Sequence, residues 1–137
     1  MSQAAEFAYE LMIRELHLDT FGHVNNATYA DLFEEARWQL ITQNGYGLKE
    51  VQERKIGPVV LEMDIKFLRE LTLRERVKIV SKMLSYEKKI ARMSQIIYNE
   101  KGEEACTGLY TFGLFDLKAR KLIPPTPEWL KAIGWII

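Results

Sequence analysis

The stretch NATYADLFEEARWQLITQN, residues 26–44, predicts one long helix at the centre of the fold. Its apolar side chains recur at helical spacing and form a single stripe, which comprises Tyr29, Leu32, Phe33, Ala36 and Leu40. Gly45 follows the stretch and can adopt the left-handed conformation that ends many helices. We therefore expect a helix of roughly five turns, from about Asn26 to Asn44.

Strands are predicted on both sides of this helix, because apolar and polar residues there alternate with a period of two. The clearest pattern covers residues 59–68. Further strands are expected at residues 7–16, from 77 up to a hairpin loop at 86–89, at 90–98 and at 104–116. A second tight turn is expected at 99–102, and Thr126 is expected to cap a short helix at 127–133.

These elements predict an α+β fold, in which one helix faces an antiparallel sheet whose last four strands follow one another in hairpin order. Small residues in the helix, Ala27, Ala30 and Ala36, would allow a sheet to approach closely and wrap around it. The edge strand of such a sheet needs cover, which predicts a dimer with a continuous sheet. A chain of 137 residues suits a single domain, over residues 1–137.

Composition and charge exclude several classes of protein. Nineteen Lys and Arg side chains stand against nineteen Asp and Glu, so no global basic field is available for nucleic acid. No apolar run reaches the roughly 20 residues of a membrane span, and the first residues do not resemble a signal peptide. We therefore expect a cytoplasmic protein that binds neither nucleic acid nor membrane. The single cysteine, Cys106, stands in an apolar stretch and is predicted to be buried.

The segment before the long helix, residues 19–26, combines a carboxylate with a helix N-terminus. The first N–H groups of a helix lack intrahelical acceptors and carry partial positive charge, so they can bind the oxygen of a polarised carbonyl. The carboxylate of Asp19 can activate water or attack such a carbonyl itself. An aspartate before a helix also commonly forms a turn or a cap, and the residues alone leave both roles open.

The run LHLDTFGHVNNATY, residues 16–29, and the block LFEEARW, residues 32–38, resemble the 4-hydroxybenzoyl-CoA thioesterase family. They are most similar to its bacterial long-chain acyl-CoA thioesterase III branch. The sequence FDLK at 115–118 is a weaker match. The resemblance implies a hotdog fold, an antiparallel five-stranded sheet wrapped around one long central helix, and the short C-terminal helix fits that fold. It also implies an acyl-CoA thioesterase acting on a fatty, medium- to long-chain acyl group.

The resemblance implies roles for individual residues. Asp19 is expected to be the catalytic carboxylate, as nucleophile or general base, and the backbone N–H of Asn26 to polarise the thioester carbonyl. The acyl group is expected in an apolar tunnel at a dimer interface, in a homodimer or homotetramer, with CoA along the surface. No metal or cofactor is implied. Residues that can line the tunnel, or else fill the core, are Trp38, Met63, Phe67, Met83, Met93 and Phe112.

Further residues of the motif are weaker candidates. His23 can contact the substrate, tune Asp19 or hold the loop by hydrogen bonds. The side chains of Asn25 and Asn26 can cap the helix. The candidate substrate-binding residues are Val24, Asn25 and Tyr29. The tyrosine also belongs to the apolar stripe, so packing is its alternative role.

Two acids inside the helix, Glu34 and Glu35, are rival catalytic groups. They stand about two turns, roughly 12 Å, beyond the helix N-terminus and are therefore far from its free N–H groups. Arg37 follows Glu34 by three residues, so a surface ion pair is the structural explanation that we expect.

Three other functions have weaker support in the sequence. The acyl donor can be an acyl carrier protein, although this neutral chain offers no obvious basic surface for an acidic carrier. A non-catalytic acyl-CoA binding module would bind acyl-CoA tightly without releasing thiol. A hotdog dehydratase or hydratase would need a catalytic histidine in another loop, and neither His17 nor His23 stands in such a context.

Overall fold

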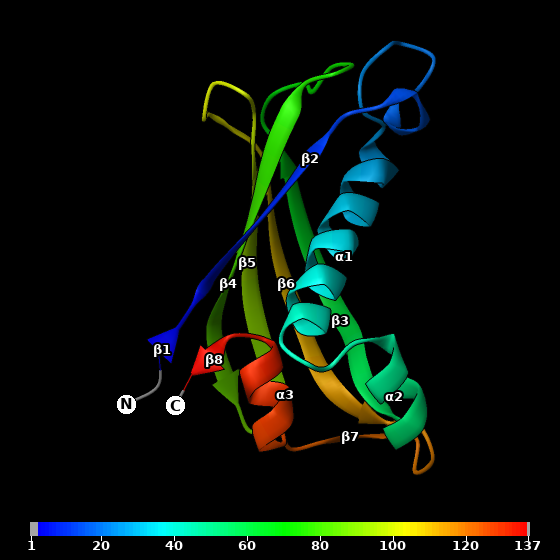
Figure 1. The fold of residues 1–137 in the computed structure, drawn as a ribbon, viewed down its shortest axis with the longest axis vertical. Coiled ribbons are helices and arrows are strands. Elements are labelled where there is room, and N and C mark those ends of the chain that lie inside the picture. The colour runs from blue at the N-terminus through cyan, green and yellow to red at the C-terminus, as the bar shows by residue number, and fades with distance from the viewer. Residues whose placement is uncertain (1–2, 137) are drawn as a thin grey trace.

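A computed structural model describes residues 3–136, in which one long helix lies against an antiparallel sheet (Figure 1). This helix, α1, spans Asn26–Gln43, and Asn44 is its C-terminal cap. At its start the Asn25 side chain accepts a hydrogen bond from the Ala27 N–H at 2.8 Å, as expected of an N-cap. At its end Gly45 has a φ of +92°, so the predicted helix boundaries are confirmed.

Five long strands form the sheet that faces α1. They are β2 (Glu6–Met12), β3 (Ile56–Phe67), β4 (Arg76–Glu87), β5 (Ile90–Tyr98) and β6 (Glu104–Asp116). They lie in the order β2-β4-β5-β6-β3, and each neighbouring pair is antiparallel. The additional short strands are β7 (Lys121–Ile123), which pairs with β6, and β1 (Gln3–Ala4), which pairs with β8 (Trp135–Ile136).

The order of the strands differs from the hairpin order predicted from the sequence. β3 pairs with β6 and β4 pairs with β2, so among the five long strands consecutive pairing holds only for β4, β5 and β6. Those three strands are joined by tight turns, with Lys88 at a φ of 55° and Gly102 at +80°. Residues 68–75 instead carry the chain across the sheet. Pairing between strands distant in sequence leaves no trace in a local pattern, which explains the error.

Three short elements also depart from the sequence-based expectation. The first strand ends at Met12, because the chain then turns into a 3₁₀ helix, η1 (Glu15–His17). The predicted polar connection contains a helix, α2 (Leu48–Arg54), which has no buried residue and hence no apolar stripe to reveal it. Strand β7 is only three residues long, which is too short for an alternating pattern.

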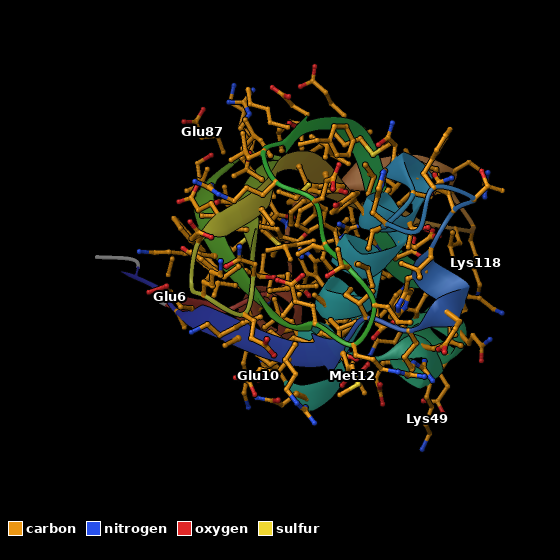
Figure 2. The ribbon with its side chains drawn as sticks, turned by 90° about the horizontal axis from the view of Figure 1, so that it is seen from above. Glu6, Glu10, Met12, Lys49, Glu87 and Lys118 are labelled. Carbon is orange, nitrogen blue, oxygen red and sulfur yellow. The ribbon has the colours of Figure 1, made fainter. Side chains whose placement is uncertain are left out.

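The core lies between α1 and the inner face of the sheet. Figure 2 shows side chains filling this space, while labelled charged residues such as Glu87 and Lys118 point outward. Gly108 on β6 allows the close approach of the helix, since a Cβ atom there would lie 3.1 Å from the ring of Phe33. Among the alanines expected to serve this purpose, Ala36 is buried, but Ala27 is exposed and Ala30 only half-buried.

A buried hydrogen-bond network ties α1 to the sheet. Gln95 on β5 donates from Nε2 to the Phe33 carbonyl at 3.0 Å and to Ser81 Oγ on β4 at 2.9 Å. Its Oε1 accepts from Arg37 Nη1 at 2.8 Å. Both polar atoms of Gln95 are therefore paired, as burial requires, and the network fixes the direction of the Arg37 side chain.

Part of the inner face is not covered by α1. Val60, Met63 and Phe67 of β3 pair with buried residues of β6, so they point to the same side of the sheet as the helix. Their exposed fractions are 44, 55 and 50%, respectively, which leaves an apolar surface beside α1. We call Val60, Met63 and Phe67 the β3 strip. The partner of Phe67 is Cys106, which is buried as predicted.

The last helix, α3 (Pro127–Ala132), lies at the end of the molecule where α1 finishes (Figure 1). The Thr126 side chain accepts a hydrogen bond from the Trp129 N–H at 3.2 Å, which confirms the predicted cap. Asn44 Nδ2 donates to the Ala132 carbonyl at 3.0 Å and fixes α3 against α1. Within residues 3–136, no helix is long and apolar enough to cross a membrane.

Candidate active site

The loop that carries Asp19 is closed by backbone hydrogen bonds. Leu18 and Val24 form an antiparallel bridge, and the Asp19 N–H donates to the His23 carbonyl at 3.0 Å. The Val24 N–H donates in turn to the Leu71 carbonyl, between β3 and β4, at 3.2 Å. These bonds fold the loop back on itself, so Asp19 lies beside the segment that enters α1.

The half-buried Asp19 carboxylate takes part in the turn of its own loop. Its Oδ1 accepts a hydrogen bond from the Phe21 N–H at 2.8 Å. This bond forms the turn that the sequence analysis gave as the alternative to a catalytic role. In the described part of the chain, its Oδ2 has no hydrogen-bond partner. One oxygen therefore orients the side chain, and the other is free for chemistry.

Hydrogen bonding in the first turn of α1 distinguishes Asn26 from its neighbours. The Ala27 N–H donates to the Asn25 side chain, and the Thr28 N–H donates to the Asn25 carbonyl at 3.0 Å. The Asn26 N–H has no acceptor among residues 3–136, and the residue is exposed. A free N–H at the positive end of the helix dipole can bind the oxygen of a polarised carbonyl.

His23 lies in the same loop with its side chain half-buried. Its Nε2 is 3.8 Å from Glu70 Oε1, and its ring lies beside that of Phe21 with 6.2 Å between centroids. Its carbonyl accepts the hydrogen bond from Asp19 that closes the loop. These contacts give His23 a part in holding the loop.

The three candidate substrate-binding residues have structural contacts in this chain. Val24 and Tyr29 are buried in the core, and Asn25 is the N-cap of α1. Burial raises the pKa of Tyr29 to about 12. The ring of Tyr29 meets that of Phe67 edge-on, with 5.3 Å between centroids, so the first turn of α1 adjoins one end of the β3 strip.

His17 also supports the loop, a role that the sequence did not reveal. It is buried, its Nδ1 accepts the Arg14 N–H at 2.9 Å, and its carbonyl accepts the Asn25 N–H at 3.3 Å. Burial and the positive charge of Arg14 lower the pKa of His17, against an opposing effect of Glu35. No sequence pattern identifies a histidine whose side chain accepts a hydrogen bond from a backbone N–H.

Glu35 has a structural partner. It accepts a hydrogen bond from the Tyr9 hydroxyl, which connects α1 to β2. This hydrogen bond and burial raise the pKa of Tyr9 to about 12. The contact agrees with the structural role that the sequence favoured for Glu35.

The ion pair predicted between Glu34 and Arg37 is not formed among the described residues, and that prediction is wrong. Arg37 turns towards the sheet, where it donates to Gln95, and its Cζ lies 4.1 Å from the centroid of the Tyr110 ring. Gln95 is 58 residues away in sequence, so helical spacing could not reveal it. Glu34 remains exposed.

An apolar cavity of about 320 Å³ lies between the second half of α1, the start of β3, β6 and α3. Its volume is within the range of small-molecule sites. Its walls include Val60 of the β3 strip together with three residues that were predicted to line the tunnel or fill the core, namely Trp38, Met93 and Phe112. Of the other residues offered, Met83 is buried in the core.

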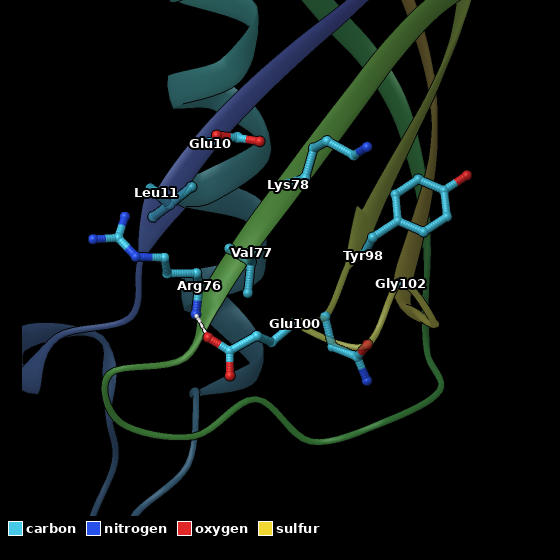
Figure 3. A pocket seen from close by; sticks show the side chains of 9 residues that line it. Glu10, Leu11, Arg76, Val77, Lys78, Tyr98, Glu100 and Gly102 are labelled. Atoms are coloured by element: carbon cyan, nitrogen blue, oxygen red, sulfur yellow. Dashed lines mark hydrogen bonds between the residues drawn. The ribbon is translucent and has the colours of Figure 1, made fainter.

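A second depression, of about 440 Å³, lies on the outer face of the sheet, away from α1 (Figure 3). Its walls carry opposing charges, because Glu10 and Glu100 stand near Arg76 and Lys78. The backbone N–H of Arg76 also donates to Glu100 Oε1 at 3.4 Å. The sheet separates it from α1, so we assign it no part in the site. Residues 3–136 also contain no group of His, Cys, Asp or Glu side chains suited to a metal ion.

Comparison with known proteins relates this geometry to a family. A family model described as the thioesterase-like superfamily matches residues 13–133. The long-chain acyl-CoA thioesterase FadM of Escherichia coli is 32% identical over 115 residues, which cover 83% of this chain and 86% of FadM.

Solved structures share the fold. The probable thioesterase YbaW of Escherichia coli superposes with a TM-score of 0.81 at 29% identity, covering 93% of this chain and 98% of YbaW. A Staphylococcus aureus protein in complex with CoA superposes with a TM-score of 0.87 at 19% identity, covering 94% of this chain and 82% of that protein. The predicted hotdog fold is thereby confirmed. The chain belongs to the thioesterase-like superfamily, an acyl-CoA thioester hydrolase family.

Proposed function

We propose that this chain hydrolyses long-chain acyl-CoA thioesters to a free fatty acid and CoA, with Asp19 as its catalytic carboxylate. The observation that carries the proposal is the position of a free Asp19 oxygen in the loop that leads directly to a free Asn26 N–H. The similarity to FadM, a long-chain acyl-CoA thioesterase, supports the substrate class.

In the proposed reaction, the Asn26 N–H donates a hydrogen bond to the thioester carbonyl oxygen. This donor and the helix dipole stabilise the negative charge that develops on the oxygen when the carbonyl carbon is attacked. Asp19 either removes a proton from the attacking water or attacks the carbon itself, and water then hydrolyses the resulting anhydride. The C–S bond breaks, the CoA thiolate takes up a proton, and the acyl group leaves as a carboxylate.

The acyl chain has an apolar path along α1. The path begins where Phe67 meets Tyr29 in the first turn of α1, follows the β3 strip and ends at the cavity that Val60 lines. Figure 1 shows the loop at one end of α1, and the residues of α1 that line the cavity belong to the second half of the helix. A short acyl group would occupy only the beginning of this path, so burial of apolar area favours long chains.

The test is thiol release from a series of acyl-CoA substrates, from short to long and including one aromatic, with wild type and Asp19→Asn. An asparagine keeps the side-chain oxygen that accepts the Phe21 N–H, so the turn is expected to survive. We expect the substitution to reduce turnover by roughly 10²-fold or more, the scale of a lost acid–base group. Near wild-type turnover would remove Asp19 from the mechanism.

Asp116→Asn is the matched control. Asp116 also accepts backbone hydrogen bonds in a turn, from the Lys118 N–H at 2.9 Å, but it lies at the end of β6. We expect its substitution to leave turnover unchanged. Thiol release from acyl carrier protein substrates alone would mean that the acyl donor is a carrier protein and not CoA. Tight acyl-CoA binding without thiol release from any substrate would indicate a binding module instead.

A further inference from the structure

The cavity between α1, β3 and α3 has two charged side chains on an otherwise apolar wall. One is Arg37, which is half-buried and uses one N–H group to donate to Gln95. A guanidinium has five N–H donors and no acceptor. Throughout residues 3–136, no carboxylate forms a salt bridge with Arg37. A cationic donor without a counter-ion therefore borders the cavity.

The other charged side chain is Glu34, one helical turn earlier. It is exposed, borders the same cavity and makes no hydrogen bond or ion pair with the described residues. An ionised carboxylate can only accept hydrogen bonds. The wall thus presents a donor and an acceptor that are not paired with each other.

The position of Arg37 is determined by the core and not by solvent. Gln95 is fully buried, and the Phe33 carbonyl and Ser81 Oγ hold its Nε2, so its Oε1 points in one direction. The guanidinium stacks on the Tyr110 ring as well. Groups that are oriented before a ligand arrives lose little entropy on binding, which is typical of a recognition site.

A hydroxyl group complements this pair, because it can accept from Arg37 and donate to Glu34. A carboxylate can accept from Arg37 but cannot donate to Glu34, and the negative charge of Glu34 repels it. A methylene group would leave the guanidinium against hydrocarbon without a partner, which costs free energy.

The distance from the proposed reaction centre indicates where the hydroxyl lies on the chain. Glu34 and Arg37 stand eight and eleven residues beyond Asn26, roughly 12 and 16 Å along the helix at about 1.5 Å per residue. An extended chain advances roughly 1.2 Å per bond, so it reaches the pair about 10 to 13 bonds from the thioester carbonyl.

We propose that the cavity binds the distal part of a long acyl chain, and that Arg37 and Glu34 select chains that carry a hydroxyl group about 12 carbons from the thioester. The proposal rests on the proposed function, because that function places the thioester carbonyl at Asn26.

The first experiment compares thiol release by the wild-type protein from octadecanoyl-CoA, 12-hydroxyoctadecanoyl-CoA and 3-hydroxyoctadecanoyl-CoA. The 3-hydroxy compound controls for position, since its hydroxyl lies near the loop. We expect kcat/KM for the 12-hydroxy compound to exceed the other two by about tenfold or more, the scale of one hydrogen bond to a charged group. Equal values for the 12-hydroxy and unsubstituted chains would overturn the proposal.

Variants test whether the two side chains cause the selectivity. Arg37→Met removes the donors and keeps the apolar stem, and Glu34→Ala removes the acceptor at an exposed position where folding is not at risk. We expect each to bring the ratio of the two kcat/KM values close to one. Arg54→Met is the control, because Arg54 also stacks on a tyrosine, Tyr46, at 5.1 Å but does not border the cavity. An undiminished ratio in Glu34→Ala and Arg37→Met would refute the assignment.

Binding separates this proposal from the proposed function. Calorimetry with Asp19→Asn gives the Kd of each acyl-CoA without turnover, and we expect the 12-hydroxy chain to bind about tenfold more tightly. If no acyl-CoA releases thiol from wild type but the Kd ratio holds, the proposed function fails and the selectivity stands. If thiol is released but the 12-hydroxy and unsubstituted chains have nearly equal kcat/KM values and nearly equal Kd values, only the proposed selectivity fails.

Discussion

At the scale of single residues, Asp19 orients its own loop and is also the proposed catalytic carboxylate. Its Oδ1 accepts the Phe21 N–H, so the carboxylate is held in one orientation before a substrate arrives. The candidate pair of Asp19 and Asn26 could be predicted because both residues lie within one short, recognisable motif. The hydrogen-bond partner of Arg37 could not be predicted from the sequence, since Gln95 reaches it only through the packing of β5 against α1.

His17 provides a prediction about pH. The pKa of His17 is lowered in the folded chain, chiefly by burial and then by Arg14. As the pH falls below the ordinary histidine pKa of about 6.5, His17 therefore takes up a proton more readily in the unfolded chain than in the folded chain. The contribution of His17 to stability is therefore complete above that pH and is lost as the pH falls towards the folded pKa. We expect the free energy of unfolding to decrease as the pH is lowered from about 7.5 to about 5.5, across the ordinary histidine pKa.

Denaturant unfolding of wild type and His17→Asn at both pH values measures this effect. The Oδ1 of asparagine can replace Nδ1 as acceptor for the Arg14 N–H, but it does not titrate. The variant should therefore lose less stability than wild type on acidification. The same loss in both proteins would show that His17 is not responsible.

At the scale of elements, local signals predicted the helices and strands that end in local caps and turns. α1 was located by its stripe, by Asn25 and by Gly45, while the predicted bounds of β5 and β6 coincide with the structure. The order of the strands depends on pairing between distant segments, and α2 lacks an apolar face. Both therefore left no local pattern to follow.

Gly108 on β6 determines how closely α1 can pack on the sheet. A Cβ there would lie 3.1 Å from the Phe33 ring and 2.9 Å from the Tyr110 ring, and both rings are buried. We expect Gly108→Val to force the helix away and to lower the free energy of unfolding by about 1–3 kcal/mol, as overpacking of a core does. Denaturant unfolding monitored by circular dichroism measures the change.

The neighbouring residue on the same strand gives the control. Thr107 faces away from α1, so Thr107→Val adds no volume between helix and sheet and should change stability by less than about 0.5 kcal/mol. Equal stability of Gly108→Val and wild type would mean that the close contact does not limit the packing of α1.

At the scale of the whole molecule, β3 is an edge of the sheet and also forms the wall of the proposed acyl path. Its outer backbone groups have no neighbouring strand among residues 3–136. Beside them, Leu61 and the β3 strip expose apolar side chains. A long, apolar edge strand invites pairing with a second chain. A second copy of the chain would cover the edge and enclose the acyl path, so the dimer expected from the sequence remains a prediction and β3 is its proposed site.

Charges on this edge should prevent the pairing. We expect wild type to sediment as a dimer or a larger assembly, and Leu61→Lys combined with Met63→Lys to shift it to a monomer, because lysines on an edge strand disfavour edge-to-edge contacts. The matched control combines Leu84→Lys with Leu109→Lys, which replaces two exposed leucines on the interior strands β4 and β6. The control should keep the wild-type assembly in analytical ultracentrifugation. A double lysine variant on β3 that still sediments as wild type does would place the interface elsewhere. A monomeric wild type would contradict the predicted dimer and would leave the proposed acyl path open along β3.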